Sequence, residues 1–96
     1  MNTLSLDSRV QTSKEVLAQE IQGEAVLLNL KTSVYLGLDQ IGTRIWQVLH
    51  SGGSLRDAHQ AVLSEYDVES QRSERDLIAL VERMVENQLV TVGQAE

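Results

Sequence analysis

The apolar positions of this chain change their spacing near residue 38. An apolar run over 25–30 follows Gly23, and over 34–38 apolar residues alternate with less apolar ones. A period of two is typical of strands, and a glycine before such a run commonly marks a turn. The pattern predicts a hairpin of these two strands, with weaker strand signals at 10–12 and 15–21.

Beyond residue 38 the apolar residues recur at helical spacing, which predicts three helices. Asp39 caps the first, which ends at Gly52 and Gly53, and Ser54 caps the second. The third runs over 69–88. The expected inward positions of the first two helices are Ile41, Ile45, Trp46 and Leu49, then Leu55, Ala58, Ala61, Val62 and Tyr66, with Asp57 as an acidic partner in the second helix's first turn.

Strands followed by three helices define the fold class. We predict an α+β domain, winged helix-turn-helix-like, with an N-terminal three-stranded antiparallel sheet followed by three helices. The chain has 96 residues, which suits a single domain over 1–96, with 1–8 and 93–96 expected to be flexible. A short extended segment over 89–92 finishes the chain.

The third predicted helix has a wider apolar arc than packing on a core requires. Its apolar residues cover nearly half of the circumference, against a stripe of about 100° for a core-facing helix. Part of this face is therefore free to line a groove, with Asp76 and Arg83 at its rim. Plain core packing of Leu80 and Met84 is an equally good interpretation. The arc comprises Leu77, Ile78, Leu80, Val81, Met84, Val85 and Leu89.

Composition argues against several classes of function. The net charge is −6 and the three aromatic residues are Tyr35, Trp46 and Tyr66, so neither phosphate contacts nor base stacking is favoured, and no nucleic-acid partner is expected. The absence of cysteine suggests a cytoplasmic location, since disulfides and thiolate metal sites are ruled out. No signal segment or membrane span is visible, so no membrane partner is expected.

Catalytic and metal-binding patterns are also missing. His50 and His59 lie nine residues apart in different predicted helices, and no glycine-rich elbow surrounds a serine. Solvated or half-buried histidines are the simpler interpretation. Gly52, Gly53 and Ser54 lack the lysine of a phosphate-binding loop, so they are interpreted as a helix terminator. We therefore predict no enzyme activity, no cofactor and no metal.

An ordered set of motifs over residues 23–92 resembles the PqqD-like family of peptide-recognition domains. Lasso-peptide members look closer, notably in the Val-Leu-Leu strand and the Leu-Val-rich third helix. The pyrroloquinoline quinone member looks more distant, because its expected Tyr-Pro-Glu-Gly sequence is replaced by Asn-Leu-Lys-Thr over 29–32. The motifs are Gly23, Val26-Leu27-Leu28, Lys31-Thr32-Ser33, Tyr35, Leu38-Asp39, Gly42-Thr43 and Ile45-Trp46, then Gly53, Glu65-Tyr66-Asp67-Val68, Asp76-Leu77, Leu80-Val81 and Leu89-Val90.

The resemblance implies a noncatalytic domain that binds the leader segment of a ribosomally made precursor peptide. In the family the leader adds as an antiparallel strand to a sheet edge, here 33–36, against the third helix, here 76–84. Backbone bonds then supply affinity and side-chain pockets supply specificity. The implied peptide-binding residues are Ser33, Val34, Tyr35, Leu36, Asp76, Leu77, Leu80, Arg83 and Met84.

The resemblance also implies two partners, the precursor peptide and a separate modifying enzyme or leader protease. A homodimer through the edge strand is a further expectation, because an unpaired edge invites pairing. The alternative function is that of a winged-helix transcription regulator. Two substitutions follow from the expected geometry: Leu36→Pro to remove an edge amide and Met84→Glu to disrupt the helix face.

Overall fold

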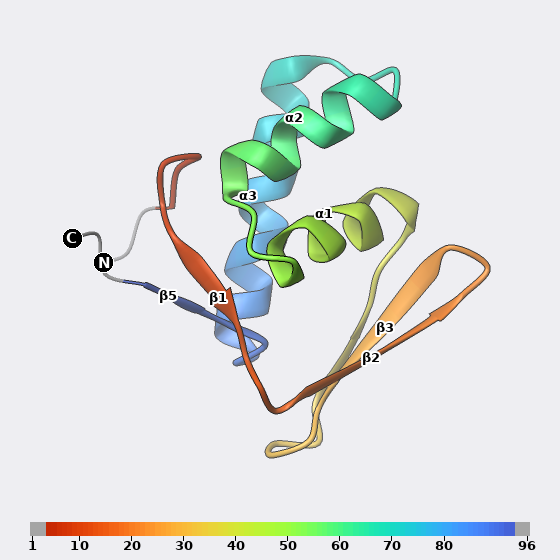
Figure 1. Cartoon of the computed structure of the whole chain (residues 1–96), viewed down its shortest axis with the longest axis vertical. Coiled ribbons are helices and arrows are strands. Elements are labelled where there is room, and N and C mark those ends of the chain that lie inside the picture. The colour runs from red at the N-terminus through yellow and green to blue at the C-terminus, as the bar shows by residue number, and fades with distance from the viewer. Residues whose placement is uncertain (1–3, 94–96) are drawn as a thin grey trace.

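The computed structural model describes residues 4–93, which form five strands and three helices (Figure 1). The elements are β1 (Val10–Thr12), β2 (Val16–Ile21), β3 (Glu24–Asn29), β4 (Tyr35–Gly37), α1 (Gln40–His50), α2 (Leu55–Glu65), α3 (Ser70–Glu86) and β5 (Val90–Val92).

Two antiparallel sheets organise the described chain. The larger has the strand order β2-β3-β4, and this confirms the predicted α+β class with a three-stranded sheet ahead of three helices. The second sheet pairs β1 with β5, joining Val10 to Val92. The sequence signals located both short strands but did not predict their pairing, because nothing local links segments so far apart in the chain.

The turn between β2 and β3 has two residues with positive φ. Gln22 has φ 56° and Gly23 has φ 82°, the combination that a two-residue type I′ hairpin requires. Glycine adopts this region freely, whereas glutamine is less suited to it.

We expect Gln22→Asn to raise the free energy of unfolding by about 0.5 kcal/mol, because asparagine tolerates the left-handed region better than glutamine. Urea denaturation would measure the change. Gln22→Val is the matched control and should lower stability, since a β-branched residue is strained at positive φ. Equal midpoints for the two variants would contradict this account of the turn.

The predicted helix starts are confirmed by their capping bonds. The Asp39 carboxylate accepts a hydrogen bond from the Gly42 amide at 2.7 Å. At the start of α2, Ser54 Oγ accepts from the Asp57 amide at 2.9 Å, and the Asp57 carboxylate accepts from the Ser54 amide at 3.0 Å. These bonds satisfy amides that a helix leaves unpaired at its N-terminus, so they fix where α1 and α2 begin.

The join between α1 and α2 requires a glycine for a steric reason. A Cβ at Gly53 would lie 2.6 Å from Val48 Cγ1 and 2.9 Å from the Val48 carbonyl oxygen. Gly52, with φ 98°, supplies the left-handed residue that ends α1. The two glycines therefore set the tight turn that packs α2 onto α1, as the sequence predicted for a helix terminator.

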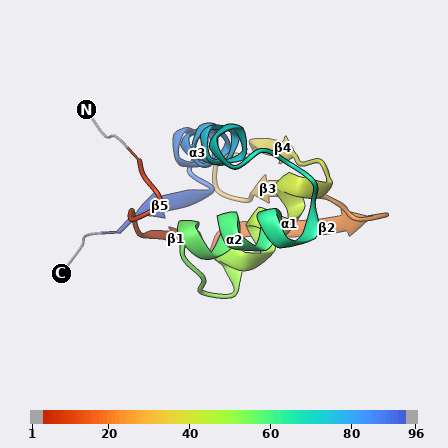
Figure 2. The same cartoon turned by 90° about the horizontal axis from the view of Figure 1, so that it is seen from above.

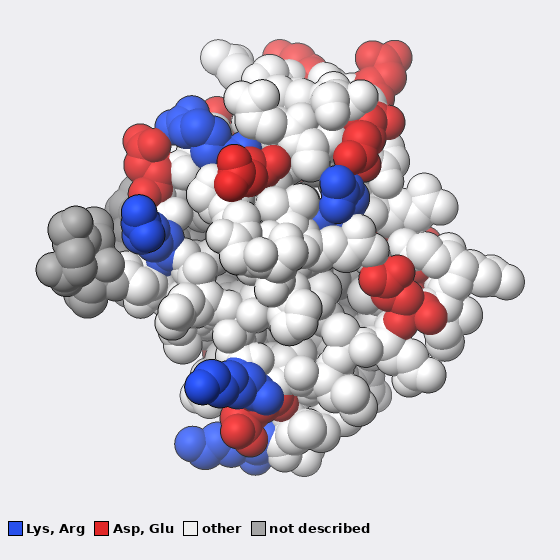
Figure 3. All heavy atoms as spheres, viewed as in Figure 1, with Lys and Arg blue, Asp and Glu red and all other residues white. Residues whose placement is uncertain are grey.

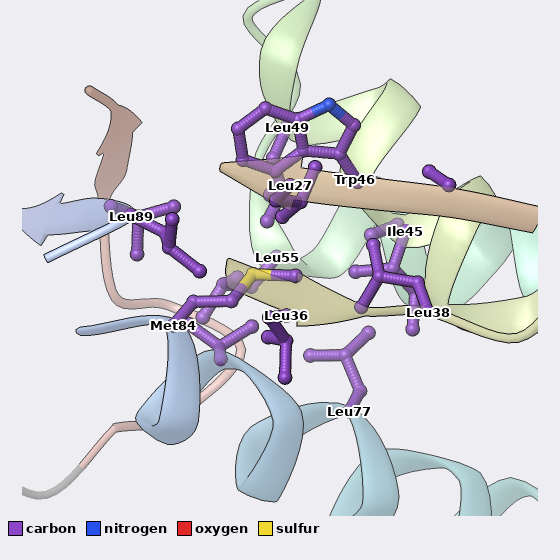
Figure 4. Close-up of a cluster of buried hydrophobic side chains, with 14 of the residues drawn as sticks. Leu27, Leu36, Leu38, Ile45, Trp46, Leu49, Leu55, Leu77, Met84 and Leu89 are labelled. Carbon is purple, nitrogen blue, oxygen red and sulfur yellow. The ribbon is translucent and has the colours of Figure 1, made fainter. Parts of the chain in front are cut away.

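The core lies between one face of the β2-β3-β4 sheet and the three helices (Figure 4). Leu27 from β3, Leu55 from α2 and Met84 from α3 are fully buried within it. Leu4 and Leu6 are also buried and belong to the same core. Two buried leucines thus pack the start of the described chain against the core, whereas the expected flexibility of 1–8 stays a prediction. Residues 1–3 and 94–96 lie outside the described residues.

The third helix is shorter than predicted and its buried face is narrower. It ends at Glu86, and the chain reverses at Gln88, which has φ 60°. Leu89 is fully buried, but it lies beyond the helix and does not extend its face. The fully buried helix residues are Leu77, Val81 and Met84, whereas Ile78, Leu80 and Val85 are only partly buried at the two sides of the stripe.

Charges on the face shown in Figure 3 are scattered and of both signs, with no continuous basic stripe. Within residues 4–93 no helix is both long and apolar enough to cross a membrane.

Candidate functional site

Among the strands that the structure describes, β4 lies at one edge of the three-stranded sheet and pairs with β3 alone. The amide of Leu38 donates to the Ala25 carbonyl at 2.8 Å, and the amide of Asn29 donates to the Val34 carbonyl at 2.8 Å. Leu36 lies opposite Leu27 between these two bonded pairs. Residues 34, 36 and 38 therefore direct their backbone groups toward β3.

The same alternation turns the backbone of Tyr35 and Gly37 away from β3. Each of these residues presents one N–H and one C=O to the free edge, which gives four backbone groups for an added strand. The register refines the expected edge: the backbone of Leu36 faces β3, whereas the backbone of Gly37, which lay outside the predicted segment 33–36, faces the free edge. The alternation of apolar residues in the sequence indicates which residues share a side of the strand. Which of the two sets directs its backbone toward β3 depends on the register between the strands.

Ser33 and Val34 belong to the turn before β4 rather than to its free edge. Ser33 has φ 64°, and its amide donates to the Asn29 carbonyl at 2.8 Å. The Val34 amide contacts Thr32 Oγ1 at 3.3 Å. Both residues are exposed, so their side chains are accessible even though their backbones serve the turn.

A cleft of about 750 Å³ opens beside the end of β4, between the β4–α1 join and α3. Figure 2 shows β4 alongside α3 when the molecule is seen from above. One wall comprises Gly37, Leu38, Asp39, Ile41, Gly42 and Ile45, and the other comprises Asp67, Val68, Glu69, Arg72, Ser73, Asp76, Leu77, Leu80 and Arg83.

Four of the predicted helix residues lie on this cleft, namely Asp76, Leu77, Leu80 and Arg83. Leu80 is partly exposed, whereas Leu77 is only 1% exposed and forms the deep floor. Met84 is fully buried and does not line the cleft. The expectation that Met84 floors the groove is therefore corrected, because the helix turns this side chain into the core.

Leu36 and Tyr35 point to opposite faces of the sheet. Leu36 is 7% exposed and lies near Leu77 and Met84 of α3 (Figure 4). It therefore helps to attach β4 to α3. Tyr35 is 71% exposed on the face away from the helices.

The cleft wall at the β4–α1 join was missed by the sequence interpretation. The wall combines the last residues of β4 with the first turn of α1. The very short join between this strand and this helix is the feature of the sequence from which the wall could have been predicted. The capping bond between Asp39 and Gly42 fixes this corner. A Cβ at Gly42 would lie 3.3 Å from Asp39 Oδ1, so the corner is tightly packed.

Charges of both signs surround the apolar floor of the cleft. The basic side chains are Arg72 and Arg83, and the acidic ones are Asp39, Asp67, Glu69 and Asp76. Among residues 4–93 the ion pairs join Arg44 to Glu65 at 2.9 Å and Arg56 to Asp7 at 2.6 Å, away from the cleft. The Arg44 pair joins α1 to α2, and its side-chain hydrogen bond with Glu65 raises the pKa of the guanidinium.

Asn29 attaches the turn before β4 to the end of α3. Its side-chain nitrogen donates to the Gln88 carbonyl at 2.9 Å, and its side-chain oxygen accepts from the amides of Lys31 and Thr32 at 2.9 and 3.1 Å. The residue is 2% exposed, so these bonds satisfy a buried amide group. This contact holds β4 and α3 together at the end opposite the cleft.

The two histidines lie apart from the cleft. His50 is exposed, stacks on Trp46 with ring centroids 5.4 Å apart, and has Nδ1 3.1 Å from Thr12 Oγ1. His59 is buried, with Nε2 3.1 Å from the Ser70 carbonyl oxygen, so the half-buried interpretation is wrong for this residue. Within the described part of the chain no three potential ligands of the His, Cys, Asp or Glu type cluster around a metal-sized space.

The site is thus a free strand edge beside a mixed-charge cleft in an α+β domain of winged-helix type. Residues 24–90 match the family model described as coenzyme PQQ synthesis protein D (PqqD). The chain belongs to the PqqD family. No curated protein matches the chain.

Two solved structures are similar over nearly their whole length. One is described as TbiB1 in complex with the TbiA(beta) leader peptide; it has 35% sequence identity and a TM-score of 0.80, covering 90% of this chain and 99% of that one. The other is a lasso peptide synthetase B1 complexed with the leader peptide, with 32% identity and a TM-score of 0.74, covering 85% of this chain and 96% of that one.

Proposed function

We propose that this chain binds the leader segment of a ribosomally synthesised precursor peptide by strand addition. The observation that carries the proposal is the outward-facing backbone of Tyr35 and Gly37 next to the cleft of about 750 Å³. A peptide strand needs a row of free backbone groups for affinity and a pocket for alternate side chains. Both lie side by side here, and both similar structures hold a leader peptide.

The strand register defines which leader side chains enter the cleft. Leader residues paired with Leu36 and Leu38 direct their side chains to the inner face of the sheet, toward the cleft. Its apolar floor of Ile45, Leu77 and Leu80 suits an apolar side chain. Arg72 and Arg83 at the rim are placed to meet leader carboxylates.

The expected affinity follows from these contacts. Four backbone hydrogen bonds at about 1 kcal/mol each and two apolar anchors at about 2 kcal/mol each sum to roughly 8 kcal/mol. This corresponds to a dissociation constant of about 1 μM before the leader's ordering cost is subtracted.

The role in the pathway is noncatalytic. The chain presents the bound precursor to a separate modifying enzyme or leader protease, in the cytoplasm. The leader occupies the edge of β4 in the complex. A homodimer that pairs two copies through this edge therefore forms only in the absence of peptide.

A titration tests the proposal. Fluorescein-labelled leader peptides encoded beside the gene, together with the TbiA(beta) leader, are titrated with the protein and followed by anisotropy. Saturable binding of micromolar or weaker affinity to at least one neighbouring leader is expected, with none to a scrambled sequence of the same composition. Saturable binding to a DNA duplex library at physiological salt, with no leader bound, would favour the regulator alternative and refute the proposal.

A further inference from the structure

Strand β4 and helix α3 run in opposite directions beside the cleft. The start of β4 is attached to the end of α3, because the Asn29 amide donates to the Val34 carbonyl and the Asn29 side-chain nitrogen donates to the Gln88 carbonyl. At the other end, the last residues of β4 and residues 67–69, just ahead of α3, line the cleft together. A leader that adds antiparallel to β4 therefore runs in the same direction as α3, with its N-terminal side beside the start of the helix.

The charged residues of the cleft are unevenly distributed along this direction. Beside the start of α3 the cleft carries four carboxylates and one guanidinium, which leaves a net charge of −3 there. Beyond Leu80, Arg83 is the charged residue among the described residues that line the cleft. We call the first group the acidic end and Arg83 the basic end, and all of these side chains are exposed. The acidic end comprises Asp39, Asp67, Glu69, Arg72 and Asp76.

The cleft charges are not used in ion pairs within the described chain, since the pairs found among residues 4–93 lie elsewhere. Asp39 serves the fold, because its carboxylate accepts the capping bond from the Gly42 amide. Glu69 differs from it. This residue occupies the N-cap position of α3 but makes no side-chain capping bond, so its carboxylate is available to a ligand.

The rise of a helix and the rise of a strand set the spacing of matching charges on a leader. Glu69 and Arg83 are 14 positions apart in the sequence. At 1.5 Å per residue this is about 21 Å along α3. An extended peptide covers that length with about six residues. Leader side chains that meet the two ends of the cleft are therefore about six positions apart.

We infer that the cleft selects leaders with a particular charge order: lysine or arginine on the N-terminal side of the bound segment, and aspartate or glutamate about six residues later. The inference rests on the proposed leader binding at β4. Backbone hydrogen bonds to an edge strand form with any sequence, so side-chain contacts must distinguish leaders that share the same apolar anchors. Arg72 can meet one leader carboxylate, but the carboxylates around it outnumber it.

Two synthetic peptides based on the leader encoded beside the gene test this charge order. Both keep every apolar residue of that leader. The first carries lysines on its N-terminal side and glutamates about six positions later, and the second exchanges them, so composition and net charge are equal. Anisotropy titration should show that the first peptide binds about 10-fold more tightly, a difference suited to a few exposed ion pairs. The two affinities should converge in about 1 M NaCl, where the Debye length is about 3 Å.

A variant with exchanged charges should reverse the preference. Asp67→Lys, Glu69→Lys and Arg83→Glu together make the start of the cleft net positive and its far end negative. We expect this triple variant to bind the second peptide more tightly than the first. Urea denaturation checks that the variant is folded. The comparison of the two peptides on the wild-type protein needs no variant, so it tests the inference whatever the stability of the triple variant.

The matched control makes the same kinds of substitution on α3 outside the cleft. Glu74→Lys, Glu82→Lys and Arg75→Glu change the net charge by the same amount, and these residues line a separate hollow. This control should keep the wild-type preference for the first peptide. A reversed preference in the control as well would assign the effect to net charge and overturn the inference.

The failure of this inference is distinct from the failure of the proposed function. Equal affinities of the two peptides for the wild-type protein at low salt would overturn the charge order and leave leader binding intact. An unchanged preference in the folded triple variant would do the same. No binding of either peptide or of the natural leader would instead refute the proposed function, and the inference with it.

Discussion

Gly37→Pro is expected to weaken leader binding about 10- to 100-fold while the domain stays folded. Proline removes the outward amide of Gly37 and leaves a leader carbonyl without its donor, a loss of about 1–3 kcal/mol. The fold tolerates the change, because edge strands accept proline where the missing N–H faces away from the sheet. Anisotropy titration gives the affinity, and circular dichroism with urea denaturation gives the stability.

Two variants control for this result. Gly37→Ala keeps the amide, and its Cβ would meet no heavy atom within 4 Å, so leader affinity should remain at the wild-type level. Leu36→Pro removes an amide that points to β3, so it should destabilise the domain rather than act on binding alone. Wild-type affinity in folded Gly37→Pro would show that the leader adds elsewhere.

Met84→Glu is expected to cause a severe loss of stability. Met84 is fully buried in the core, so the substitution buries a carboxyl group among apolar side chains and costs about 4 kcal/mol or more. That is a large part of the 5–15 kcal/mol that stabilises a typical domain. Urea or thermal denaturation would measure the loss, and a folded variant of wild-type stability would contradict the buried position.

Leu80→Glu separates binding from folding on the same helix. Leu80 is partly exposed on the cleft, so the domain should remain folded while leader affinity falls about 30-fold with the loss of one apolar anchor worth about 2 kcal/mol. Ile78→Glu is the matched control, because Ile78 is partly buried on α3 but lies outside the cleft. It adds the same charge and should leave the affinity unchanged; equal losses in both variants would point to net charge instead of the cleft.

Local patterns predicted most of the elements because their causes are local. The carboxylate of Asp39, the Ser54 and Asp57 pair and the glycines at 52 and 53 act within four residues, so they are visible in the sequence. The strand at 10–12 was also located correctly. Its pairing with β5 was not, because that contact joins opposite ends of the chain.

The site was predicted less completely than the fold. Asp76, Leu80 and Arg83 were expected at the cleft and lie on it, but a helical angle alone did not separate Leu80 from the buried Met84. Which side of the apolar arc of α3 faces the core depends on where the rest of the chain packs. In this domain Leu36 of β4 packs against the side that contains Leu77 and Met84. That contact exists only in the folded domain.

The sequence by itself determined the order of strands and helices, their caps and turns, and the resemblance to the PqqD family, because these depend on neighbouring residues and on ordered motifs. Only the tertiary structure decided that Gly37, not Leu36, directs its backbone to the free edge, since strand register assigns each amide to one side. It also decided that α3 and the start of α1 line one cleft, because that cleft arises from the packing of segments distant in the chain.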